Sequence, residues 1–263
     1  ANLHAMKTAL LLSGGMDSRL IVAMLRQQGA AVPTLNIAPP GSQDLIYGRL
    51  AAQAAGTDHL EFDETGGDGD FGARRNRAVS AWDNHLERTA MRSDHDRLIW
   101  SGDGGSVGLG HVYIDDRIVA NARTGNMEAA ARAILAVNRF SLSARSFNRA
   151  HRNEVHLPMT SLCEDLSTRP HVEPGRNTHL FFMLNDQRRH LVSHFETLHL
   201  HKLDLVLPFF DGRFLTAVLS NPVDPFLQHR LYNQIMTLLP FGLGLVPWQA
   251  YPVVRRRYRL TVP

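Results

Sequence analysis

A six-residue segment near the start of the chain, Ser13–Ser18, has the sequence S-G-G-M-D-S. Its paired glycines permit a tight turn that points backbone N–H groups into one concavity, and the serine hydroxyls add donors. Asp17 is a carboxylate inside this anion-binding loop, which makes sense if it holds a divalent cation that bridges to phosphate oxygens. The spacing fits neither a Walker A loop nor G-x-G-x-x-G. We predict a phosphate-binding loop; the alternative is a plain strand-to-helix turn capped by Asp17 or Ser18.

A second glycine-rich segment, Ser101–Ser106, has the sequence S-G-D-G-G-S and precedes Gly108 and Gly110. Both segments directly follow apolar runs that are typical of short buried strands. The expected strands cover Lys7–Leu12, Val32–Ile37, His59–Phe62 and Leu98–Trp100. The expected helices cover Arg19–Gln28, a segment from an N-cap at Ser42 through Ala55 with Gly56 as its stop, and Gly72–Arg92.

This alternation predicts an α/β fold with a Rossmann-like parallel sheet flanked by helices. Ligands of such sheets bind at the carboxyl ends of the strands, so both glycine segments are expected at one edge. Strand-like runs become rare after Ile118, and the later helices are expected over Met127–Val137, Thr178–Leu200, Asp211–Leu219 and Phe226–Leu239. We expect a phosphate-binding α/β part over residues 1–122 and a mainly helical part over residues 123–263, with one continuous domain as the alternative.

Composition sets limits on the class of protein. The 263 residues include 28 basic and 25 acidic side chains, and the hydrophobic fraction of 44% excludes a mostly disordered chain. The basic balance suits an anionic partner such as a nucleotide, pyrophosphate or RNA, although solvated arginines explain it equally well. No apolar run is long enough for a membrane helix. The single cysteine, Cys163, excludes an internal disulfide and fits a cytoplasmic setting.

The first segment resembles the PP-loop, S-G-G-x-D-S, of ATP pyrophosphatases, which release pyrophosphate while adenylating a substrate. The second resembles the S-G-[DE]-G-[SG]-D-E segment of the asparagine synthetase family, a branch of these enzymes. Two shorter matches, Pro39–Asp44 and Pro208–Asp211, fit the same branch, and the resemblance spans roughly residues 7–250. It implies a PP-loop fold and a cytoplasmic, ATP- and Mg²⁺-dependent ligase that joins a carboxylate to an amine or ammonia.

The resemblance also implies a set of site residues. Those that would bind the nucleotide and pyrophosphate are Leu11, Leu12, Ser13, Gly14, Gly15, Asp17, Ser18, Ile37, Gly102 and Gly104. Asp17 would hold the metal, and Asp103 and Arg188 would be catalytic. The expected partners are a small-molecule or peptide carboxylate, an amine or ammonia donor, and a separate glutaminase or other partner chain, with neither nucleic acid nor membrane.

Three departures from the family pattern qualify this expectation. Ser106 stands where the family has a second metal-binding aspartate, a loss that Asp103, Asp115 or Asp116 could compensate. No lysine lies in the late segment around residues 247–250, so its charge would have to come from the arginine run at 255–257 or from Lys202. The N-terminal glutaminase domain of true asparagine synthetases is not expected here, because residues 1–6 cannot replace it.

Other functions remain open at this level. A tRNA-modifying PP-loop enzyme would use arginines such as Arg145, Arg149 and Arg152 to hold RNA, and salt-dependent RNA binding would support it. A nucleotide-binding protein with impaired catalysis is the third possibility. His190 and His194 lie one helical turn apart, but no carboxylate pairs with them in the sequence pattern, so they are interpreted as ordinary surface or core residues.

Overall fold

The computed structural model describes residues 8–63, 69–89, 97–110, 113–138, 148–168 and 173–248. Its contacts divide the chain into two compact units. Unit 1 comprises residues 1–103, 192–208 and 235–263, and unit 2 comprises residues 104–191 and 209–234. The predicted division into residues 1–122 and 123–263 stays a prediction.

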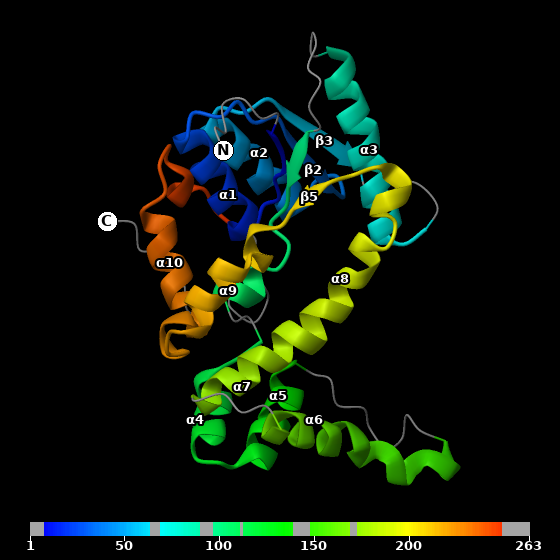
Figure 1. The fold of residues 1–263 in the computed structure, drawn as a ribbon, viewed down its shortest axis with the longest axis vertical. Helices are drawn as coiled ribbons and strands as arrows, with labels where there is room; N and C mark the ends of the chain where they lie inside the picture. Colours follow the sequence, from blue (N-terminus) through cyan, green and yellow to red (C-terminus); the bar gives the residue numbers. More distant parts are fainter. Residues whose placement is uncertain are drawn as a thin grey trace. The chain divides into compact units, whose positions relative to one another are not determined.

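Unit 1 is built on a five-stranded, wholly parallel sheet (Figure 1). Its strands, in chain order, are β1 (Thr8–Leu11), β2 (Thr34–Ala38), β3 (His59–Asp63), β4 (Leu98–Trp100) and β5 (Leu205–Val206). In space their order is β3-β2-β1-β4-β5. The direction of travel across the sheet therefore reverses between β1 and β4, which is the point where such sheets form a ligand crevice. The predicted Rossmann-like α/β fold is confirmed.

Helices cover both faces of this sheet. The helices between its strands are α1 (Met16–Gln27), α2 (Gln43–Ala55) and α3 (Phe71–Thr89). Side chains alternate along a strand, so one face carries Ala9, Leu35 and Ile99, which pack in a buried cluster with Val79 and Trp82 of α3. The opposite face carries the buried Asn36, whose side-chain amide donates to the carbonyl of Asp44 in α2 (3.1 Å). The inner strands β1 and β2 are thus buried from both sides, as is typical of parallel sheets, whereas the edge strand β3 is largely exposed.

The predicted caps of α2 are confirmed. The Ser42 hydroxyl accepts from the backbone N–H of Leu45 at 3.2 Å, and Gly56 ends the helix in the left-handed conformation at φ 62°. The predicted β1–β4 and α1–α3 regions are also present, with shifts of a few residues at their ends. The strand β5 was not predicted, because two residues are too few to show a periodic pattern.

Unit 2 contains most of the helices after β4. Among the described residues, the later helices are α4 (Asp116–Arg123), α5 (Met127–Asn138), α6 (Leu157–Thr168), α7 (Pro174–Phe181), α8 (Arg188–Phe195), α9 (Gly212–Leu219) and α10 (Arg230–Thr237). π-Helical segments cover Ser106–Gly110 and Phe182–Gln187, and the second of these separates α7 from α8. Short 3₁₀ segments of the chain cover Arg149–His156, Leu198–His201, Pro208–Phe210, Asp224–His229 and Leu243–Leu245. The helix expected over Phe226–Leu239 begins only at Arg230, because Leu227 and Gln228 have non-helical backbone angles.

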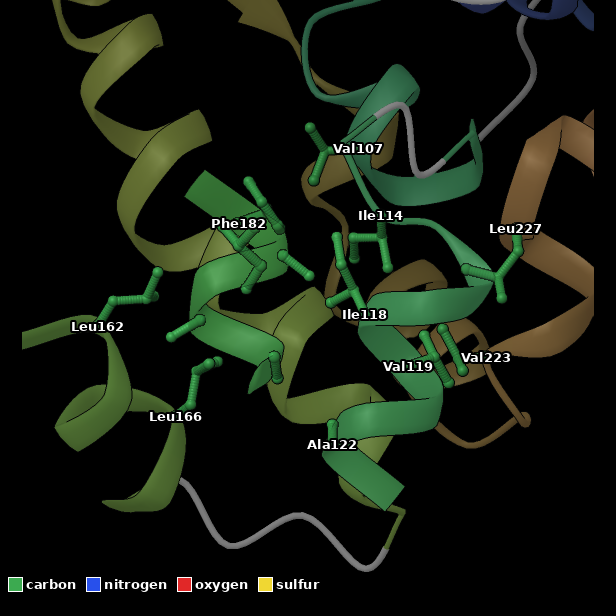
Figure 2. Packing of buried hydrophobic residues seen from close by; sticks show 14 residues of the cluster. Val107, Ile114, Ile118, Val119, Ala122, Leu162, Leu166, Phe182, Val223 and Leu227 are labelled. Atoms are coloured by element: carbon green, nitrogen blue, oxygen red, sulfur yellow. The ribbon is translucent and has the colours of Figure 1, made fainter. Parts of the chain in front are cut away.

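The core of unit 2 is a cluster of buried apolar side chains (Figure 2). Ile118 and Ala122 lie one turn apart on α4, and Leu162 and Leu166 lie one turn apart on α6, so each helix presents an apolar stripe to the same cluster. Phe182 of the π-helical turn fills the space between them. Among the described residues, no helix combines the length and apolar character needed to cross a membrane.

Candidate functional site

The Ser13–Ser18 loop joins β1 to α1 and is closed by its own two serines. The Ser13 N–H donates to the Ser18 hydroxyl at 3.0 Å, the two hydroxyls lie 3.0 Å apart, and the Gly15 N–H donates to the Ser13 hydroxyl at 3.2 Å. Gly15 is the N-cap of α1 and has no side chain with which to cap the first turn. The alternative of a turn capped by Asp17 or Ser18 is therefore wrong, and the loop presents the N-terminus of α1, which attracts anions.

A second carboxylate reaches this loop from α2. The Gly14 N–H donates to Oδ1 of Asp44 at 2.9 Å, and a Cβ on Gly14 would lie 2.8 Å from the Asp44 carbonyl oxygen. Only glycine allows so close an approach between the loop and α2. Asp44 ends the family-like segment Pro39–Asp44, but the sequence pattern alone did not indicate a role for it. Its contact with Gly14 depends on how β2 and α2 fold back onto the loop.

The end of β4 lies against the same loop. A Cβ on Gly102 would lie 2.8 Å from the Ser18 nitrogen and 3.1 Å from the Asp17 Cβ. Within unit 1 the structure thus brings the first glycine-rich segment and the start of the second, Ser101–Asp103, together at the carboxyl edge of adjacent strands. Leu11 and Leu12 at the end of β1, and Ile37 near the end of β2, lie at the same edge. Whether these residues bind a nucleotide stays a prediction.

Asp103, which follows Gly102, is held by an ionic cluster. Its Oδ2 lies 3.0 Å from Nη2 of Arg75 and accepts from the Ser101 hydroxyl at 2.9 Å, and its Oδ1 lies 3.7 Å from Nδ1 of His194. Burial alone would raise the pKa of the Asp103 carboxyl. The His194 ring, the Arg75 charge and the Ser101 hydroxyl outweigh burial and lower that pKa to about 2. Asp103 is therefore an ionised anchor at neutral pH.

Two helices place the partners of Asp103. Arg75 lies on α3, and its Nη1 lies 2.8 Å from Nδ1 of His194 on α8. Asn76 fixes the same helix pair by donating to the His194 carbonyl at 3.0 Å and to the Thr197 hydroxyl at 2.9 Å. His194 is a buried core histidine, and its carboxylate neighbour Asp103 comes from a distant part of the sequence, so the local pattern could not show it. The His190 side chain lies outside the described residues.

Comparison with known families identifies the α/β part of the chain. Residues 5–95 match the family model of asparagine synthase. This region is therefore similar to the asparagine synthase family. The matched residues of the synthase domain include the Ser13–Ser18 loop and Asp44, and they end before the second glycine-rich segment. The asparagine synthase family consists of ATP-dependent ligases, so the match supports an enzyme in general terms. No curated protein matches the chain.

The acidic groups at the loop of the synthase domain are compatible with a Mg²⁺ ion. Mg²⁺ is commonly held by one or two carboxylates together with phosphate oxygens and water. Asp17 lies in the loop, and Asp44 contacts it through Gly14. Among the described residues there is no group of three or more His, Cys, Asp or Glu side chains arranged to hold a metal. These two carboxylates therefore suit a metal that arrives with a nucleotide better than one held by protein alone.

Two predicted site residues belong to unit 2. Gly104 has φ +87°, and a Cβ there would lie 2.6 Å from the ring of Phe210, so glycine is needed on both counts. Arg188 is the first residue of α8 and is exposed. Their roles stay predictions.

Two of the three acids proposed to replace the missing metal ligand at Ser106, Asp115 and Asp116, have other partners within unit 2. Asp115 caps α4 by accepting from the Ile118 N–H at 2.8 Å. Asp116 forms an ion pair with Arg230 at 2.9 Å. The arginine run at 255–257 lies outside the described residues, as does Arg145, and Lys202 is exposed.

Proposed function

We propose that this protein is an ATP-dependent, AMP-forming amide synthetase. A carboxylate oxygen of the substrate attacks the α-phosphorus of ATP, and the bond from that phosphorus to the β-phosphate oxygen breaks, so that pyrophosphate leaves. An amine or ammonia then attacks the acyl carbon, and the bond to AMP breaks. Adenylation supplies the leaving group, and the protein has to position the reactants and offset phosphate charge.

One observation carries the proposal: two glycine-rich segments meet where the strand order reverses. The Ser18 nitrogen lies so close to Gly102 that a methyl group could not fit between them. Open α/β sheets bind nucleotides at this position, outside the carboxyl ends of the strands where the strand order reverses. The asparagine synthase match over residues 5–95 supports ATP-dependent amidation as the general class of reaction.

Each group in the loop has a distinct task in this scheme. The backbone N–H groups of Gly14 and Gly15 would donate to the β- and γ-phosphate oxygens, because the bonds they make now, to Asp44 and to the Ser13 hydroxyl, lie within the loop region and are exchangeable. Asp17 and Asp44 would hold Mg²⁺, which supplies neutralisation of the pyrophosphate charge. The first turn of α1 would add its partial positive charge.

Asp103 has a positioning task in this scheme. Its carboxylate is already engaged by Arg75, Ser101 and His194, so it fixes the end of β4, and with it Gly102, against the loop. A carboxyl whose pKa is about 2 is a poor proton acceptor at neutral pH. The same engagement favours a second candidate function, in which the protein binds nucleotide without turning it over.

A pyrophosphate-release assay over a panel of carboxylates, with and without ammonium or amines, tests the proposal. Mass spectrometry of the products identifies the amide and AMP. Pyrophosphate and AMP in equal amounts, dependent on one carboxylate, are the expected result. Release of inorganic phosphate with ADP would contradict an adenylating enzyme, and tight ATP binding with no release for any carboxylate would favour the second candidate.

A further inference from the structure

Arg19 is the residue that follows the Ser13–Ser18 loop, and its position is unfavourable on two counts. Its side chain is almost completely buried, with 1% of the residue exposed. A buried guanidinium loses its water and needs hydrogen-bond acceptors in return. Arg19 also lies in the first turn of α1, where the helix dipole repels a cation. A residue that stays there despite both costs is held by specific contacts.

Backbone carbonyls from two separate segments supply those contacts. Nη1 donates to the carbonyl of Val246 at 2.5 Å and to that of Leu243 at 3.4 Å. Nη2 donates to the carbonyl of Pro247 at 2.8 Å and to that of Gly14 at 3.3 Å. One planar group therefore joins the glycine loop to the late segment Leu243–Pro247, all within unit 1. Such a fork of donors is available to arginine and not to lysine.

The hydrogen bond from Arg19 to the Gly14 carbonyl affects the direction in which the Gly15 N–H points. The peptide unit between Gly14 and Gly15 is planar and trans, so its C=O and N–H point in opposite directions. Arg19 holds the carbonyl from one side, which leaves the Gly15 N–H facing the Ser13 hydroxyl at 3.2 Å, on the inner side of the loop. A glycine pair is otherwise free to rotate this peptide, because neither residue has a Cβ to restrict it.

We propose that Arg19 is a positioning residue that sets the Gly14–Gly15 peptide for phosphate binding and fixes Leu243–Pro247 beside the loop. The burial of Leu243, of which none is exposed, anchors the second partner. The consequence for ATP rests on the proposed function; the coupling of the two segments does not. Arg19 acts through the loop backbone, so its loss should weaken nucleotide binding more than the chemical step.

Arg26 provides a matched control on the same helix. It also donates to backbone carbonyls, from Nε to Ala55 at 3.0 Å and from Nη1 to Ala30 at 2.8 Å. These acceptors lie at the far end of α1, away from the loop. Arg19→Lys and Arg26→Lys therefore make the same chemical change and lose the same kind of bond, at opposite ends of one helix.

The experiment measures amide hydrogen exchange of the ligand-free full chain and the KM and kcat of pyrophosphate release. Arg19→Lys should speed amide exchange about tenfold in residues 13–18 and 243–248. It should also raise the KM for ATP about tenfold, while kcat stays within about twofold of the wild-type value. A tenfold change corresponds to the free energy of one good hydrogen bond. Arg26→Lys should leave these segments and the KM unchanged. Equal effects of the two variants, or none from Arg19→Lys, would overturn the proposal.

The wild-type protein gives a second measurement if Arg19→Lys does not fold. In native-state exchange under mild denaturant, the two segments should open together, with one shared free energy. Opening at clearly different denaturant concentrations would show that Arg19 does not couple them. If wild type releases no pyrophosphate with any carboxylate while the exchange results hold, the proposed function fails and the coupling by Arg19 stands.

Discussion

The two glycine-rich segments follow neighbouring parallel strands and have similar compositions, yet their polar groups are held in different ways. In Ser13–Ser18 the bonds run between hydroxyls and backbone N–H groups, and Asp44 is the charged group that the structure shows accepting from the loop. At the end of β4, Asp103 is fixed by Arg75 and His194, two nearly buried side chains from other helices. The hydrogen-bonding groups of Ser13–Ser18 can exchange their present partners for phosphate oxygens, whereas the ion pairs of Asp103 fix the conformation at the end of β4.

The glycine-rich composition therefore locates a segment at the end of a strand, but it does not show whether the polar groups of that segment bind a ligand or stabilise the fold. Neutral hydrogen bonds within a loop contribute about 1 kcal/mol each and are replaced at little cost by a charged ligand. Removing one partner of a buried ion pair costs about 3–5 kcal/mol, because the other charge stays buried. A ligand can therefore rearrange the first segment much more readily than the second.

Asp17→Ala is the variant expected to have the largest effect on the first segment. Asp17 is the carboxylate inside the loop, so its loss leaves phosphate charge without a bridging cation. Pyrophosphate release should fall by about 100-fold or more, in the range seen when a main electrostatic group is removed, with the melting temperature little changed. Asp58→Ala, at an exposed position of the same unit, is the control. Near-normal turnover of Asp17→Ala would contradict the assignment of Ser13–Ser18 as the ligand-binding segment of the two.

Gly102→Ala should disturb the contact between the two segments. The added methyl would lie 2.8 Å from the Ser18 nitrogen, so the loop or the end of β4 has to move. We expect ATP binding to weaken by about tenfold or more and stability to fall by about 1–3 kcal/mol, the usual cost of overpacking. Isothermal titration and denaturant unfolding measure both. Gly212→Ala, where a Cβ meets nothing within 4 Å, should change neither by much; equal effects of the two variants would show that the close approach is unimportant.

Asp103→Asn tests the fixed character of the second segment through pH. The pKa of Asp103 is lowered from 3.8 to about 2 in the folded protein, so the folded state binds fewer protons than the unfolded state between these values. Its stabilising effect is complete above about pH 4 and is lost as the pH falls through about 2. The variant should be at least about 2 kcal/mol less stable than wild type at neutral pH, the value that the pKa shift alone implies, and the gap should narrow below about pH 4.

The same variant separates anchoring from catalysis. If Asp103 only holds the end of β4, Asp103→Asn should lose turnover mainly through weaker ATP binding, with kcat changed less than KM. A large fall in kcat with unchanged stability across this pH range would make Asp103 catalytic and would remove the contrast between the two segments.

Arg188→Ala should have the smallest effect on stability. Arg188 and its neighbour Arg189 are both exposed on α8, so truncating either should change the unfolding free energy by less than about 0.5 kcal/mol. If Arg188 contacts the substrate, pyrophosphate release should fall several-fold in Arg188→Ala and not in Arg189→Ala. Identical kinetics for the two variants would remove Arg188 from the candidate site.

The sequence predicts features that depend on interactions between residues close together in the chain, and it misses those that depend on distant residues. Ser42 and Gly56 mark the ends of α2 through local hydrogen bonding and backbone preference, and both are legible within a few residues. The Ser13–Ser18 loop is equally local. The Asp103 cluster is not, because its partners Arg75 and His194 lie on helices that only the fold brings together. Residues such as these carry no pattern in their own neighbourhood.

The contacts of Arg19 show the same limit more strongly. Its acceptors are backbone carbonyls of residues 243, 246 and 247, and a carbonyl leaves no trace in the amino-acid sequence. What the sequence could have offered is the oddity of an arginine in the first turn of a helix. The strand β5 was missed for a related reason, since Leu205 and Val206 become a strand by pairing with β4.

Hydrogen exchange of the wild-type chain with and without Mg-ATP tests the central claim most directly. The account predicts slower exchange of the amides of residues 13–18 and 101–103 when nucleotide is present, because both segments would line one crevice at the reversal between β1 and β4. Protection of residues 13–18 alone would show that the second segment takes no part in binding. Protection confined to other parts of the chain, or none at saturating Mg-ATP, would contradict the account.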